Sequence, residues 1–61
     1  MATEILIIDD NADIRSILDE LIQDAGYKTR LAANFNQGLS EIDKKLPDVA
    51  IIDVKLDKGD N

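Results

Sequence analysis

Two runs of apolar residues, each ending in aspartate, stand out along the chain. Residues 5–8 (Ile-Leu-Ile-Ile) precede the pair Asp9-Asp10, and residues 49–52 (Val-Ala-Ile-Ile) precede Asp53. Both runs are apolar at consecutive positions, which predicts strands covered on both faces, as in a parallel sheet. Each aspartate therefore falls where a buried strand reaches the edge of the sheet.

Between these runs, apolar residues recur at the spacing of amphipathic helices. They are Ile14, Ile17, Leu18, Leu21, Ile22 and Ala25 in the first set, and Phe35, Leu39, Ile42 and Leu46 in the second. Asn11 and Asn34 precede the two sets as candidate N-cap residues. Gly26 follows the first set, at a place where a left-handed residue commonly ends a helix.

The predicted order of elements is β-α-β-α-β. The expected ranges are strands at 4–9, 27–31 and 49–53, helices at 12–25 and 34–45, and a closing loop at 54–61. Right-handed crossovers over a parallel sheet suit this order. Residues 27–31 alternate charged with less polar side chains, which is typical of an edge strand. The expected sheet order is therefore 2-1-3, with the two apolar strands adjacent in one α/β unit spanning residues 1–61.

Composition narrows the functional classes. The chain has 61 residues, enough for one domain with a marginal core, and its apolar content of 44% is that of a globular chain. The net charge of −6 argues against direct binding to nucleic acid or to anionic membranes. No apolar run approaches the roughly 20 residues of a membrane span, so we expect a cytoplasmic protein.

Parallel neighbouring strands would bring the carboxylates of Asp9, Asp10 and Asp53 to the edge where open α/β sheets place ligands. Two carboxylates about 4 Å apart repel by roughly 4 kcal/mol at an effective dielectric near 20. A hard divalent cation, Mg²⁺ or Mn²⁺, offsets that repulsion, and the Lys55 carbonyl could supply a further oxygen. Asp53 could then act as a nucleophile in phosphoryl transfer. The competing interpretation is that these are ordinary strand-ending and turn residues.

Other chemistry finds less support. Neither His nor Cys is present, and no glycine-rich phosphate loop follows a strand. Arg15, one turn into the first helix, could contact a partner, although an exposed helical arginine is more often only solvated. A Mg²⁺-dependent phosphohydrolase of the haloacid-dehalogenase kind is disfavoured. That chemistry needs acids two positions apart after the first strand, whereas Asp9 and Asp10 are adjacent.

In combination, three stretches resemble the receiver domain of bacterial two-component response regulators, the CheY-like family. They are residues 5–11 with Arg15, the pair Gly26-Tyr27, and residues 46–56 around Asp53. The resemblance implies a truncated flavodoxin-like fold with Asp53 as the phospho-acceptor. It implies a Mg²⁺ site formed by Asp9, Asp10, Asp53 and the Lys55 carbonyl. It also implies, as donor, a sensor histidine kinase or a phosphotransfer protein, and a domain that assists its own phosphorylation without being an enzyme.

Two departures from the family pattern bear on these expectations. Residues 57–61 lack the proline that usually follows the phospho-acceptor, and this polar loop is faintly similar to the nitrogen-regulation NtrX type. A complete receiver is also considerably longer, and its switch Ser or Thr and its phosphate-binding Lys have no counterpart within residues 1–61. We therefore expect phosphorylation of this segment to be slow or absent.

The same departure in length affects the expected assembly. Without a fourth strand beside it, the strand at 49–53 would present an open apolar edge, which is a template for pairing. We expect self-association through this edge, as a homodimer or a higher assembly that completes the sheet. The alternative function is then a non-catalytic dimerising interaction module whose acidic cluster is vestigial.

Overall fold

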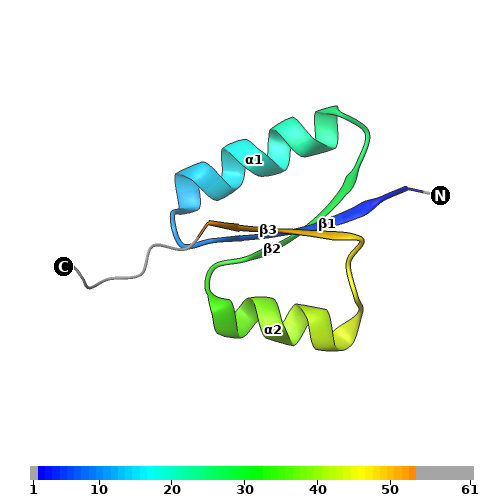
Figure 1. The fold of residues 1–61 in the computed structure, drawn as a ribbon. Helices are drawn as coiled ribbons and strands as arrows, with labels where there is room; N and C mark the ends of the chain where they lie inside the picture. The colour runs from blue at the N-terminus through cyan, green and yellow to red at the C-terminus, as the bar shows by residue number, and fades with distance from the viewer. Residues whose placement is uncertain (1, 54–61) are drawn as a thin grey trace.

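The computed structural model describes residues 2–53, and the expected loop at 54–61 lies outside the described residues. Three parallel strands form one sheet with a helix on each face (Figure 1). The strands are β1 (Glu4–Asp9), β2 (Lys28–Ala32) and β3 (Val49–Asp53), and the helices are α1 (Ala12–Asp24) and α2 (Phe35–Lys44). The sheet order is β2-β1-β3, which confirms the predicted α/β fold and the order 2-1-3.

The core lies on β1, the central strand. Leu6, Ile7 and Ile8 are at most 1% exposed, and Ile5 is also buried. Leu6 and Ile8 form a buried cluster with Ala32 that packs against α2. Because successive side chains of a strand point to opposite faces, Ile5 and Ile7 face α1 instead. Full burial of each such side chain contributes about 1.5–3 kcal/mol, so β1 supplies most of the apolar stabilisation.

The residues predicted to begin and end α1, Asn11 and Gly26, adopt the expected roles. The Asn11 side-chain oxygen accepts hydrogen bonds from the amides of Asp13 (2.9 Å) and Ile14 (3.1 Å). These bonds satisfy two of the free N–H groups at the helix start. Gly26 has a φ of +98°, a left-handed conformation that glycine adopts without strain. The helix ends before Ala25, which the expected range included, because Ala25 is the C-cap residue.

The second helix is likewise shorter than the expected range 34–45, because both limits are cap residues. Asn34 is the N-cap, and its side-chain oxygen accepts the Gln37 amide at 2.8 Å. The Gln37 side chain reaches back to the Ala33 amide at 2.9 Å. This reciprocal pair resembles a capping box, shifted by one residue on the return bond. Lys45 has an extended backbone and ends the helix.

Gly38 allows α2 to approach the sheet closely. It is the one buried residue of this helix. A Cβ atom at Gly38 would lie 2.9 Å from Cγ1 of Ile8 and nearer still to its Cδ1. Ile8 is itself 1% exposed and has little room to move. The absence of a side chain at this position therefore sets how deeply the helix packs on β1.

The charged strand β2 occupies an edge, as its alternating pattern predicted. It covers Lys28–Ala32 and not the expected 27–31, because the β1 ladder runs to the pair Ile8–Ala32. Tyr27 is excluded because its amide donates to the Ile22 carbonyl in the turn that ends α1 (3.2 Å). The side-chain alternation therefore predicted the location of the strand but not its register.

A polar cluster joins α1 to β2. The Thr29 hydroxyl donates to Oδ1 of Asp19 at 2.5 Å, and the Gln23 amide donates to the same oxygen at 2.8 Å. These two hydrogen bonds, the one from Thr29 first, hold the pKa of Asp19 below its ordinary value, because they favour the charged carboxylate.

The other edge of the sheet is apolar. Within residues 2–53, no strand pairs with the outer side of β3. Val49 is 48% exposed and Ile52 is 55% exposed, although the apolar run resembles that of β1. On the two flanking helices, Leu21 of α1 and Leu39 of α2 are also exposed. The same sequence pattern therefore gives a buried strand at the centre of the sheet and an exposed strand at its edge.

Candidate functional site

The strands β1 and β3 end side by side at the carboxyl edge of the sheet. Their parallel register places Asp9 opposite Asp53, one pair beyond Ile8 and Ile52. Neighbouring strands lie about 4.8 Å apart, and register partners point to the same face of the sheet. Two carboxylates that are distant in sequence therefore start from adjacent positions on the face covered by α1.

Asp9 is a buried carboxylate, with 1% of the residue exposed. Its Oδ1 accepts a hydrogen bond from the Asn11 amide at 2.9 Å. Its Oδ2 is buried and has no hydrogen-bond partner among the described residues. An ionised oxygen in that position is costly, because burial removes its hydration and no group within residues 2–53 donates a hydrogen bond to it. Among these residues, Asp9 thus keeps a ligand atom without a partner at the edge of the sheet.

Asp10 and Asp53 are exposed, in contrast to Asp9. Asp10 is the first residue after β1 and directly precedes Asn11, the N-cap of α1. Asp53 is the last residue of β3. Exposed carboxylates retain their hydration, so each can exchange a water molecule for a ligand at small cost. The edge therefore combines one buried and two accessible carboxylates.

The residues fit a hard cation in part. Within residues 2–53, no three acidic side chains are gathered so that they could hold a metal ion. The register of Asp9 with Asp53 and the unpartnered Oδ2 of Asp9 nevertheless supply the oxygen chemistry that Mg²⁺ prefers. The Lys55 carbonyl lies outside the described residues. The ligand set of Asp9, Asp10, Asp53 and Lys55 stays a prediction.

Arg15 has a role that we did not expect from the sequence. Its Nη1 donates to the main-chain oxygen of Asp9 at 2.7 Å, and the side chain is half-buried. The position of Arg15 four residues after the N-cap could have indicated this contact. Side chains in a helix lean toward its N-terminus, so an arginine there reaches back to the end of the preceding strand.

A second arginine organises the opposite, amino end of the sheet. Arg30 donates to the main-chain oxygen of Glu41 in the last turn of α2 (2.9 Å) and to that of Lys45, the C-cap residue (2.5 Å). It also forms ion pairs with Glu41 (3.1 Å) and Glu4 (3.5 Å). A cation at a helix C-terminus satisfies free carbonyls and complements the helix dipole. Arg30 therefore fastens the end of α2 to β1 and β2.

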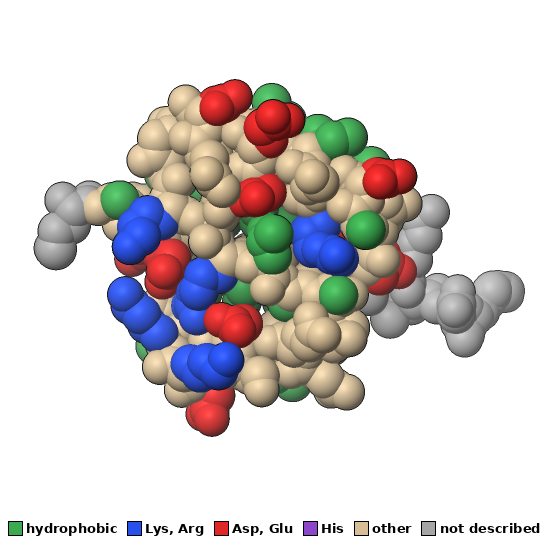
Figure 2. Space-filling model, turned by 180° about the vertical axis from the view of Figure 1, so that it is seen from behind, with side chains coloured by type: hydrophobic (Ala, Val, Ile, Leu, Met, Phe, Trp, Pro, Cys, Tyr) green, Lys and Arg blue, Asp and Glu red, His purple; other side chains and the backbone are tan. Residues whose placement is uncertain are grey.

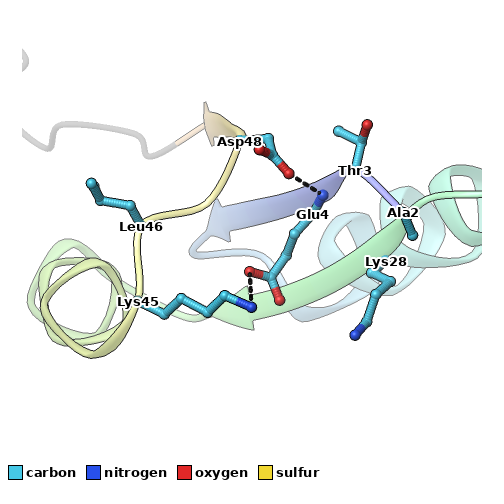
Figure 3. Close-up of a pocket in the computed structure, with 7 residues that line it drawn as sticks. All are labelled: Ala2, Thr3, Glu4, Lys28, Lys45, Leu46 and Asp48. Carbon is cyan, nitrogen blue, oxygen red and sulfur yellow. Dashed lines mark hydrogen bonds and ion pairs between the residues drawn. The ribbon is translucent and has the colours of Figure 1, made fainter.

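A hollow beside this network shows the same self-pairing of charges (Figure 3). Lys45 reaches Oε1 of Glu4 at 3.9 Å, and Oδ2 of Asp48 accepts the Glu4 amide at 2.7 Å. Figure 2 shows basic and acidic side chains intermingled over the side of the molecule that carries this end of the sheet. Glu4, Lys45 and Asp48 are thus engaged within the fold, although Lys28 also lines the hollow, and the carboxyl edge with the unpartnered oxygen of Asp9 is the stronger candidate site.

Comparison with known proteins agrees with this geometry. The family described as the response regulator receiver domain matches residues 5–60. Sporulation initiation phosphotransferase F of Bacillus subtilis (strain 168) is 41% identical over 56 residues, covering 92% of this chain and 45% of that protein. Nitrogen assimilation regulatory protein NtrX of Azorhizobium caulinodans is 36% identical over 56 residues, covering 92% of this chain and 12% of that protein. No solved structure matches the chain at a significant level.

The chain belongs to the response regulator receiver family, whose fold is the flavodoxin-like arrangement that β1 to β3 begin. It spans less than half the length of the sporulation phosphotransferase that it matches. The NtrX type is represented among the relatives. Transcriptional regulatory protein YxdJ of Bacillus subtilis, which is not named as an NtrX protein, has the same 36% identity to this chain as NtrX. The match covers 87% of this chain and 23% of YxdJ. The family is therefore shown, and the NtrX subgroup stays a prediction.

Proposed function

We propose that this chain is the phospho-acceptor portion of a receiver and that Asp53 is the residue that takes the phosphoryl group. The observation that carries the proposal is the register of Asp53 with Asp9 at the carboxyl edge, in a chain of the receiver family. Asp53 is exposed, so a donor can approach it. Asp9 is buried in register with it, and its carboxyl group would be a ligand for a bound cation.

In the proposed reaction, a carboxylate oxygen of Asp53 attacks the phosphorus of a phosphohistidine on a sensor kinase or phosphotransfer protein. The new P–O bond forms as the P–N bond breaks, and the imidazole nitrogen leaves with the electron pair and is protonated. Mg²⁺ or Mn²⁺, held by Asp9, Asp10, Asp53 and the Lys55 carbonyl, would supply charge neutralisation of the phosphoryl oxygens. Asp9 and Asp10 keep the acidic edge arranged for that cation.

The proposed role is regulatory, not enzymatic: the chain assists a change on itself. Among residues 2–53, no helix is both long and apolar enough to cross a membrane. The net charge of −6 disfavours direct binding to nucleic acid or to anionic membranes, and the proposed location is the cytoplasm, where a sensor kinase would donate the phosphoryl group.

The test is incubation of the full chain with a small acyl phosphate and Mg²⁺, followed by intact-mass analysis and mapping of the modified residue. We expect slow addition of one phosphoryl group on Asp53, lost when Mg²⁺ is chelated and in Asp53→Asn. Asp43→Asn is the matched control, because Asp43 is an exposed acid on α2. A phosphoryl group that maps elsewhere, or one that survives Asp53→Asn, would contradict the proposal.

A second candidate is the dimerising interaction module, favoured by the exposed apolar edge at Val49 and Ile52. We propose that two copies pair through β3. Sedimentation at several concentrations should show a dimer that Ile52→Lys converts to monomer. Leu31→Lys is the control, because Leu31 is a similarly exposed apolar residue on the opposite edge strand. A compact monomer at micromolar concentration would exclude this candidate.

A further inference from the structure

We propose that Arg15 is a positioning residue for the acidic site, because its guanidinium holds the main chain of Asp9 and so fixes the turn that presents Asp9 and Asp10. The inference rests on the proposed function for its consequence, since the turn matters only if the edge binds a cation. The contact itself is independent of that function. It joins the second turn of α1 to the last residue of β1.

The strand-to-helix turn is held by hydrogen bonds of two kinds. Bonds within the turn run from the Asn11 amide to Oδ1 of Asp9 (2.9 Å) and from the Asp13 and Ile14 amides to Asn11 (2.9 and 3.1 Å). A different bond comes from outside the turn, from Nη1 of Arg15 to the Asp9 oxygen (2.7 Å). It ties the helix body to the strand end, so Arg15 adds a restraint on the turn beyond the packing of α1 on β1 and β2.

The hydrogen bond from Arg15 also involves the one acid of the site whose carboxylate is buried. Asp9 is 1% exposed, and one of its carboxylate oxygens is already used to accept the Asn11 amide. Arg15 holds the main-chain oxygen of Asp9, and the Asn11 amide holds Oδ1 of its carboxylate. These two contacts restrict the orientation of the carboxylate and therefore the direction in which Oδ2 points. A ligand atom that is held in advance binds a cation more tightly, because less order is lost on binding.

An electrostatic role and a positioning role of Arg15 predict opposite changes in Mg²⁺ affinity when the residue is substituted. A guanidinium near the site repels a divalent cation, so a residue that acted only through its charge would weaken Mg²⁺ binding, and Arg15→Gln would improve it. A positioning residue strengthens binding through geometry. Both Arg15→Gln and the charge-conserving Arg15→Lys should then lower Mg²⁺ affinity by about tenfold, the effect typical of groups that orient metal ligands.

The experiment is a Mg²⁺ titration of the full chain followed by amide NMR, together with hydrogen exchange of the Asn11 amide in the metal-free protein. We expect both Arg15 variants to bind Mg²⁺ about tenfold more weakly. Exchange at Asn11 should rise by about tenfold when the turn loses a charge-assisted hydrogen bond. Arg30→Lys is the matched control, because Arg30 also donates to main-chain oxygens but at the other end of the sheet. It should lower stability without changing either readout in the folded protein.

Affinity that is unchanged or increased in Arg15→Gln would overturn the inference, as would exchange at Asn11 that matches the wild type. A wild-type chain that binds no Mg²⁺ would count against the proposed function instead. In that case the metal-free exchange still decides the role of Arg15, since faster exchange in both Arg15 variants and not in Arg30→Lys would support it.

Discussion

The two ends of the sheet carry their charges differently. At the amino end, Arg30 is paired with Glu4 and Glu41 and donates to the end of α2. At the carboxyl end, Asp9 is more deeply buried than any of these and has an oxygen without a partner among the described residues. One end uses its charges to hold the fold. The other end keeps an acidic atom available at a cost in stability, which is the usual sign of a binding site.

The amino end is not fully satisfied either. Oε1 of Glu4 and Nε of Arg30 are buried and lack hydrogen-bond partners within residues 2–53, yet they face each other at 3.5 Å. They form an ion pair without a hydrogen bond, so the geometry is looser than that of a bidentate pair. The difference between the ends therefore lies in how the side-chain charges are paired. Carboxylates form ion pairs with Arg30 at the amino end, whereas at the carboxyl end Arg15 contacts the main chain of Asp9 and not its carboxylate.

Removal of Arg30 should have the largest effect. Arg30→Met would remove the nearer of the two cations beside Glu4 and the donor to the Glu41 and Lys45 carbonyls, and we expect a loss of about 3 kcal/mol in the free energy of unfolding. This is the low end of the range for buried pairs, because the Arg30 side chain is 18% exposed. Urea denaturation measures it. Lys44→Met is the control and should change stability by less than about 0.5 kcal/mol, because Lys44 is exposed. Equal losses in both variants would mean that the amino end does not hold the fold.

At the carboxyl end, addition of Mg²⁺ should stabilise the wild type by about 2.7 kcal/mol when its concentration is one hundred times Kd. Asp9→Asn should abolish that gain. In the metal-free protein the same variant should be about 1 kcal/mol more stable, because it removes a buried charge. Thermal unfolding with and without Mg²⁺ checks both expectations. An Asp9→Asn variant that is strongly destabilised without metal would show that Asp9 supports the fold, and the contrast between the ends would fail.

Substitution at the middle of the sheet should affect both ends alike. Gly38→Ala forces a Cβ against the buried Ile8 side chain. Overpacking of this kind costs about 1–3 kcal/mol. The higher helix propensity of Ala offsets about 1 kcal/mol of that loss. We expect a net loss of about 1 kcal/mol in urea denaturation, with Mg²⁺ affinity of the folded protein unchanged. A gain in stability would mean that α2 can move away from β1 freely.

The smallest effect is expected at the α1–β2 junction and depends on pH. The depressed pKa of Asp19 means that its hydrogen bonds with Thr29 and Gln23 stabilise the fold above the unfolded-state pKa. That stability is lost as the pH falls through the folded-state pKa. Thr29→Val should therefore lower stability by less than 1 kcal/mol at pH 7, because Asp19 is partly exposed. The difference should shrink below about pH 4. Denaturation at both pH values, with Thr29→Ser as control, tests this expectation.

The sequence alone predicted much of the fold. Alternation at 27–31 indicated the edge strand, and the apolar runs at 5–8 and 49–52 indicated neighbouring strands with aspartates at one edge. These predictions succeeded because period and cap chemistry are local properties of the chain. The register of β2 was beyond reach, because it depends on the strand that lies alongside. The prediction that residues 49–52 are covered on both faces was wrong, since Val49 and Ile52 are exposed; the open edge was expected only from the resemblance to a longer domain.

The sequence itself thus determined the order of the helices and strands and the residues that cap the helices. It also determined that Asp9 and Asp53 converge, once the strands were taken as parallel neighbours. Only the tertiary structure decided the separate roles of the two arginines and the unequal burial of the acids. Hydrogen bonds from Arg15 to Asp9 and from Arg30 to the end of α2 join elements whose relative placement no local pattern encodes. The physical reason is that a long side chain finds its partner through space, whereas a helix or a strand is specified by its near neighbours in sequence.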